Sequence, residues 1–129
     1  MPITAARVAL SSTYAFEGGP DAARGAVRKH LLRTGLHLVD DGPAEVTATG
    51  GSQLVVRALG VWFAVPEAYP RQVRVTFTAT AGGTRVHAAF EETLGFAYLD
   101  ERSRRNYQAA FRTWIDGLGT ALGQQQMAS

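Results

Sequence analysis

The side chains best suited to acid–base chemistry are scattered along the chain, and one carboxylate stands out among them. Glu92 falls between Phe90 and Leu94 in a stretch that alternates apolar and polar residues. Side chains of a strand alternate between its two faces, so Glu92 points toward the interior while Glu91 points away from it. Burial can make a carboxyl group a general acid or base, so Glu92 is a weak catalytic candidate. The structural alternatives are that the strand ends there, or that an arginine at the core edge pairs with the carboxylate.

The histidines show no arrangement suited to metal binding or nucleophilic catalysis. His30 belongs to a predicted helix, His37 to a strand, and His87 to the sheet face away from the core, so they do not converge. Asp40 and Asp41 follow His37 closely, but these aspartates have the sequence setting of a turn. The chain has no cysteine, which excludes disulfides, thiolate nucleophiles and cysteine–metal sites. We therefore expect no metal site and no cofactor, and the sequence favours a protein that is not an enzyme.

A second group of candidates lies on the outward face of the predicted sheet. Arg57, Arg74, Arg85 and His87 occur there among threonines, whose hydroxyl groups could add donors for phosphates. The ordinary interpretation is a solvated face, and we favour it because the central strands place no aromatic residue there for base stacking. Nucleic-acid binding is therefore the least favoured partner class, and the net charge of +2 does not change this. The same flat, mixed face is better suited to a homodimer, paired face to face or edge to edge.

The segment 59–70 is unusually apolar for a connection between two strands. It carries the aromatic residues Trp62, Phe63 and Tyr69. One interpretation is a lid or a patch that docks a protein partner, with Trp62 and Tyr69 as anchors. The other is that Trp62 and Phe63 fold back and plug one end of the core. The second is slightly favoured, because large aromatic side chains are usually mostly buried.

The composition is that of a single globular domain. The chain has 129 residues, of which 46% are hydrophobic and 19% are charged, enough to bury a continuous core. No apolar run approaches the ~20 residues that span a bilayer. The segment Met1–Thr4 lacks the basic-then-apolar order of a signal peptide. We therefore expect a cytoplasmic protein that does not associate with a membrane.

These candidates are positioned by a strand–helix–strands–helix order. Alternation predicts strands at 7–16, 36–39, 45–49, 53–59, 72–80 and 84–94. Apolar spacing predicts one helix from Pro20 to Gly35 and another from about Asp100 to Leu122. Short turns favour antiparallel pairing, and two helices cannot cover both faces of a sheet this size. We predict an α+β domain over residues 1–122, with one antiparallel sheet of five to six strands, both helices on one face, and a disordered tail at 123–129.

This order, ending in a long apolar helix, resembles the helix-grip domains of the polyketide-cyclase and lipid-transfer superfamily. It is also similar to the TATA-binding-protein-like fold, whose curved sheet carries its helices on one side. The resemblance covers the whole chain as architecture, and no signature motif matches, so it assigns no functional residue. One predicted helix, not two, separates the first strand from the second, which argues against a deep cavity between helix and sheet.

The leading functional hypothesis is a non-catalytic binding or assembly module that acts through protein–protein contact or self-association. The alternative is a protein of helix-grip type that binds a small apolar ligand or acts as a cyclase. In that alternative Phe111 and Trp114 close a cavity lined also by Val75 and Phe77, and Glu92 is the candidate acid or base. Weak nucleic-acid binding on the open sheet face ranks third.

Overall fold

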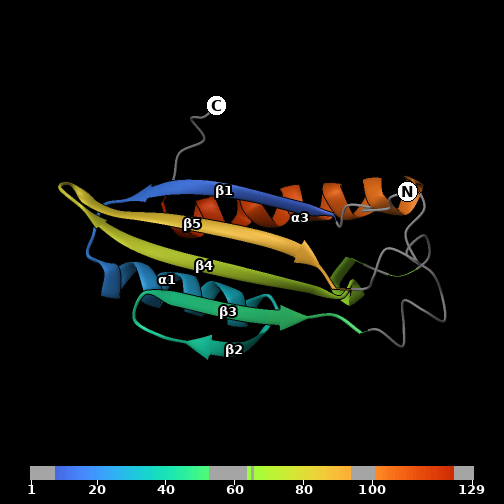
Figure 1. Cartoon of the computed structure of the whole chain (residues 1–129), viewed down its shortest axis with the longest axis horizontal. Coiled ribbons are helices and arrows are strands. Elements are labelled where there is room, and N and C mark those ends of the chain that lie inside the picture. Colours follow the sequence, from blue (N-terminus) through green and yellow to red (C-terminus); the bar gives the residue numbers. More distant parts are fainter. Residues whose placement is uncertain (1–7, 53–63, 65, 94–100, 124–129) are drawn as a thin grey trace, which may run out of the picture.

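The computed structural model describes residues 8–52, 64, 66–93 and 101–123. These residues form one antiparallel sheet of five strands with two helices (Figure 1), which confirms the predicted α+β class. The strands lie in the order β1-β5-β4-β3-β2. In chain order the elements are β1 (Ala9–Phe16), α1 (Pro20–Arg33), β2 (His37–Asp41), β3 (Glu45–Gly50), the short 3-10 helix η1 (Pro66–Ala68), β4 (Arg71–Thr80), β5 (Gly83–Glu92) and α3 (Glu101–Ala121).

The hairpin of β4 and β5 is the centre of the sheet. Its register runs from Thr80 opposite Gly83 at the turn to Arg71 opposite Glu92 at the other end. Every second side chain is buried from Arg71 to Phe77 and from Thr84 to Glu92, because a strand presents successive residues to opposite faces. At the turn Gly83 has φ +153°, and a Cβ there would collide with the backbone of Phe16, so glycine is required.

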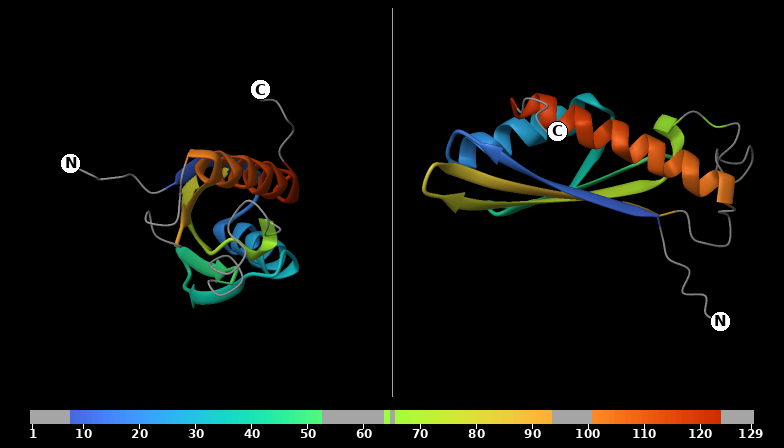
Figure 2. Two further views of the ribbon diagram at one scale, coloured as in Figure 1. Left: turned by 90° about the vertical axis from the view of Figure 1, so that its right-hand side faces the viewer. Right: turned by 90° about the horizontal axis from the view of Figure 1, so that it is seen from above.

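Both helices lie on the same face of the sheet (Figure 2), as predicted. α1 begins at Pro20, and Gly35, just beyond its end, has φ +88°, the conformation that commonly terminates a helix. α1 buries Ala23, Val27 and Leu31, which follow one another at a spacing of four. The apolar stripe of α3 packs beside them, with Tyr107, Ala110, Phe111 and Leu118 buried.

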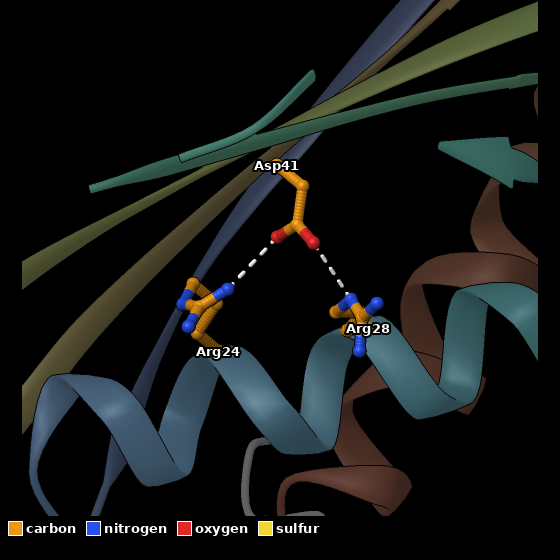
Figure 3. Close-up of polar contacts among 3 residues, drawn as sticks. All are labelled: Arg24, Arg28 and Asp41. Atoms are coloured by element: carbon orange, nitrogen blue, oxygen red, sulfur yellow. Dashed lines mark hydrogen bonds and ion pairs between the residues drawn. The ribbon is translucent and has the colours of Figure 1, made fainter. Parts of the chain in front are cut away.

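The structure corrects the prediction that Asp40 and Asp41 are turn residues, because both belong to β2. The pairing of β2 with β3 shifts register between Leu38 and Asp40 and then continues to Asp41. The carboxylate of Asp41 accepts hydrogen bonds from Arg24 Nη1 at 2.9 Å and Arg28 Nε at 2.8 Å (Figure 3). These arginines stand one turn apart on α1, so they hold the end of the edge strand against the helix.

No helix among the described residues is long and apolar enough to cross a membrane. The predicted strand at 53–59, the predicted helix start at Asp100 and the tail beyond Gly123 lie outside the described residues.

Candidate functional site: a buried charged pair under the last helix

Two oppositely charged side chains face the core at one end of the central hairpin. Arg71 is the first residue of β4 and Glu92 the last of β5, and they are direct partners in the antiparallel register. Both are in the inward phase, with exposed fractions of 3% for Arg71 and 0% for Glu92. Directly opposite residues on one face have Cβ atoms about 5 Å apart. A cation and a carboxylate therefore lie side by side in the interior.

The Arg71 side chain is held by both layers of the fold. Its Nη1 donates a hydrogen bond to the backbone oxygen of Tyr69 at 3.0 Å. Its guanidinium carbon lies 4.1 Å from the ring centroid of Trp114, which α3 contributes. Such a stacked contact is favourable because the face of an indole ring is negative, and it is stronger when water is excluded.

Tyr107 of α3 adds a hydroxyl group to the same place. The Tyr107 hydroxyl donates to the backbone oxygen of Pro70 at 2.7 Å, and the residue is fully buried. Burial first, and then the negative charge of Glu92, raise the pKa of Tyr107 above its ordinary value, so the hydroxyl keeps its proton. The ring of Tyr69 lies 4.8 Å from that of Tyr107, and burial raises the pKa of Tyr69 as well.

An aromatic wall closes the space between α3 and the sheet next to this cluster. The rings of Phe90, Phe111 and Trp114 have centroids 5.7 to 6.4 Å apart. A cavity of about 10 Å³ remains beside these rings. It is lined by Arg71, Phe90 and Trp114 and by residues near the end of α1, including His30. That volume is room for about one water molecule. Val75 and Phe77, which the cyclase-like alternative places in the lining, do not line this cavity.

The cluster lies where several elements begin or end, at the right-hand end of the sheet in Figure 1. There β1 starts, β3 and β5 end, β4 starts, and α3 starts. The backbone is tied together at this point: Glu92 N–H donates to Val8 O at 3.0 Å, and Thr93 N–H donates to Pro70 O at 3.1 Å. Pro70 O thus accepts bonds from both Thr93 and Tyr107, which fixes the entry of β4 relative to α3.

No protein-family model matches the sequence, and no curated protein matches it. Solved structures do. Protein MLL2253 from Mesorhizobium loti superposes with a TM-score of 0.56 at 12% identity, covering 89% of this chain and 96% of the other. ChR145 from Cytophaga hutchinsonii superposes with a TM-score of 0.53 at 11% identity, covering 91% of this chain and 94% of the other. StfQ, a di-domain ARO/CYC protein of the steffimycin biosynthetic pathway, gives 0.51 at 12% identity over 89% of this chain.

The architecture is helix-grip. At these identities the likeness shows the fold alone, and this chain spans about half of StfQ, 47% of its length. In the helix-grip frame the last helix is α3, and the Arg71–Glu92 pair and Tyr107 lie between that helix and the sheet it covers. The one helix predicted between the first two strands is α1.

The inward orientation predicted for Glu92 is confirmed, and the arginine expected in the structural alternative stands directly opposite it. A catalytic role for Glu92 stays a prediction. Arg71 supplies a hydrogen-bond donor, Glu92 supplies an acceptor, and Tyr107 adds a hydroxyl group. This set of groups suits recognition of a polar group more directly than bond cleavage. Among the described residues no group of His, Asp and Glu side chains could hold a metal ion.

The predicted binding residues on the open face of the sheet do not gather around the pair. Arg74, Arg85 and His87 lie exposed on the open face of the sheet. Arg74 Nε pairs with Glu45 at 2.9 Å, and His87 Nδ1 lies 3.0 Å from Thr13 Oγ1. Their proposed binding roles stay predictions.

The aromatic segment is described only in part. Tyr69, an anchor in the docking interpretation, is 4% exposed and packs on Tyr107. Trp62 and Phe63, like Arg57 of the predicted basic face, lie outside the described residues.

Sequence reasoning missed Arg71 and Tyr107. Arg71 stands two residues before Val73, so the alternation of β4 already gives it the inward phase. That signal was available, but the predicted strand began one residue later. Tyr107 belongs to the buried apolar stripe of α3, and its polar partner is a backbone oxygen of another segment, which no local pattern reveals.

Proposed function

We propose that the protein binds a small molecule with a mainly apolar body and one uncharged hydrogen-bonding group, such as a hydroxyl or a carbonyl. The body would lie between α3 and the sheet, against the Phe90 and Trp114 rings. The polar group would be recognised by Arg71, Glu92 and Tyr107. This is binding rather than catalysis.

The observation that carries the proposal is the burial of Arg71 and Glu92 beneath α3. Taking two charges out of water costs several kcal/mol per ion in effective terms, and well-packed apolar residues would stabilise the same place at least as well. Small-molecule sites, by contrast, are apolar spaces with a few convergent polar groups. A buried charged pair surrounded by aromatic rings has this character.

The balance of charge supports an uncharged ligand. Arg71 and Glu92 cancel, so an anion drawn to the guanidinium would meet the carboxylate beside it. A hydroxyl group can donate to the carboxylate and accept from the guanidinium at once. The likeness to StfQ, which belongs to a biosynthetic pathway, also supports a small organic molecule, as an analogy at the level of fold.

The cavity beside the pair has a volume of about 10 Å³. Drug-sized ligands occupy about 300–1,000 Å³, so binding must displace side chains. Trp114 is the natural candidate to move, because it is partly exposed and lies over Arg71 rather than inside the packed core.

The proposal is tested by calorimetric titration with 2-naphthol and with naphthalene, which share a ring system and differ in one hydroxyl group. We expect 2-naphthol to bind at least about tenfold more tightly, because a site built to hydrogen-bond a hydroxyl leaves buried polar groups unpaired around an analogue that lacks it. The Arg71→Met/Glu92→Leu variant should remove that preference while keeping the fold. Arg85→Met, on the open face, is the matched control.

Two results would refute the proposal. One is that neither compound binds up to its solubility limit. The other is that the double variant retains the preference for 2-naphthol, because then the hydroxyl group is not recognised by the pair.

A further inference from the structure

A groove lies between α1 and the C-terminal part of α3. Figure 2 shows these two helices on the same face of the sheet. It has a volume of about 370 Å³, which is within the range of small-molecule sites. Its lining is made of Gly25, Ala26, Lys29, His30, Arg33 and Ala121. Every charged side chain in that lining is basic, and no acidic residue contributes to it.

The basic residues of α1 fall into two sets. Arg24 and Arg28 face β2 and share the carboxylate of Asp41 (Figure 3). Lys29 and Arg33 face the groove, and within the described part of the chain neither takes part in an ion pair. They stand four residues apart, so their Cβ atoms are about 6 Å apart on one side of the helix. Two unneutralised cations therefore converge on the same space.

The glycine of α1 that lines the groove, Gly25, leaves the groove open and makes the helix less stable than alanine would. Gly25 lies inside α1, where glycine is less favourable than alanine by about 1 kcal/mol. A Cβ at Gly25 would meet no atom within 4 Å, so internal packing does not require glycine there. A larger side chain at this position would occupy the groove. Gly117 of α3 lies near the ring of His30, and a Cβ added there would be 3.7 Å from Nε2 of that ring, an ordinary van der Waals contact.

We propose that this groove binds a small molecule that carries a phosphate monoester. A phosphate monoester has a charge of about −2 at neutral pH and three acceptor oxygens, which matches the two cations. Arg33 can bind it in bidentate fashion and Lys29 as a point charge. The rest of the molecule lies over Gly25 and Ala26. This site is separate from the Arg71–Glu92 pair and goes beyond the proposed function.

The test is calorimetric titration of the whole chain at low salt with phenyl phosphate, inorganic phosphate and vesicles of phosphatidylglycerol. We expect phenyl phosphate to bind about tenfold more tightly than inorganic phosphate, with an affinity that falls as salt is added. Lys29→Gln/Arg33→Gln should weaken phenyl phosphate at least about tenfold. Gly25→Leu should weaken it similarly by filling the groove, without loss of helix stability.

Arg74→Gln/Arg85→Gln on the open sheet face also removes two positive charges and is the charge-matched control, and it should bind phenyl phosphate as the unaltered protein does. Arg71→Met/Glu92→Leu should also leave this binding unchanged, which separates the groove from the interior site. The inference is wrong if Lys29→Gln/Arg33→Gln binds phenyl phosphate normally, if inorganic phosphate binds equally well, or if vesicles bind and phenyl phosphate does not.

Discussion

Replacing Arg71 by methionine keeps an unbranched side chain, shorter than that of arginine, and removes the positive charge from the interior. Glu92, which is fully buried directly opposite, then loses the cation beside it. Breaking a buried charged pair in this way costs about 3–5 kcal/mol, because the remaining charge is uncompensated in a region that excludes water. The contact of the guanidinium with Trp114 and its bond to Tyr69 O are lost as well. We therefore expect Arg71→Met alone to lower the free energy of unfolding by an amount at the upper end of this range.

The double variant Arg71→Met/Glu92→Leu should behave differently. Both charges are gone and the space is filled by apolar side chains, a change that is neutral or stabilising by about 1–4 kcal/mol in comparable pairs. The free energy of unfolding is measured by urea titration and by thermal melting, both followed by circular dichroism. For a domain of this size 1 kcal/mol shifts Tm by about 3–5 °C, so the single and double variants should differ by more than about 10 °C.

The control is Arg85→Met, which removes an exposed arginine from β5, and it should change the free energy of unfolding by less than about 0.5 kcal/mol. The reasoning fails if Arg71→Met costs no more than this control. It fails equally if the double variant is as unstable as the single one, since the pair would then stabilise the fold and its burial would need no functional explanation.

Three further predictions concern single contacts. Tyr107→Phe removes the hydrogen bond to Pro70 O and should lower the free energy of unfolding by about 1 kcal/mol in urea titration. Burial, and after it the charge of Arg33, lower the pKa of His30 below 6.5 in the folded protein. The unfolded chain therefore takes up a proton more readily than the folded one, and the free energy of unfolding should fall as the pH drops below about 6.5. In thermal melts at pH 5 to 8, His30→Gln should lose this part of the pH dependence. Asp41→Asn breaks partly exposed ion pairs and should cost about 1 kcal/mol or less, with a difference that shrinks as salt is added.

Each of these has a control or a limit. The groups facing His30 are Lys29 and Arg33 on α1 and Arg71 on β4, and the described residues of α3 that line its surroundings carry no charge. His37→Gln, an exposed change on β2, is the control for replacing a histidine. Asp40→Asn is the neighbour control for Asp41→Asn. A loss of more than about 3 kcal/mol in Tyr107→Phe would show that the hydroxyl does more than donate one bond.

The periodic parts of the fold were predictable because their cause is local. Alternation in β4 and β5, and apolar spacing in both helices, follow from which side of an element must be buried. Asp41 shows the opposite case: two consecutive aspartates before Gly42-Pro43 favour a turn locally, yet Arg24 and Arg28 of another element keep Asp41 in the strand. Such pairing depends on tertiary structure, which the sequence of one segment does not contain.

Only part of the candidate site could be predicted from the sequence, because the rest of it depends on tertiary structure. Glu92 could be found because a charged residue in an inward phase contradicts its surroundings, and that contradiction is visible in the sequence. Its partner Arg71 shows the same contradiction, but only once β4 is known to begin there. The role of Trp114 over the guanidinium needs the crossing of α3 above the sheet, which alternation and helical spacing leave undetermined.

His30 connects the two proposed sites, because it lines both the interior cavity and the groove. The lowered pKa of His30 keeps its ring neutral near pH 7, so it adds charge to neither side there. The groove then offers two permanent cations in contact with water, and the interior offers a pair whose charges cancel. A phosphate is drawn to the first and rejected by the carboxylate of the second, whereas an uncharged hydroxyl compound gains most from the second. The two proposals therefore predict opposite preferences for charge, and each can fail while the other holds.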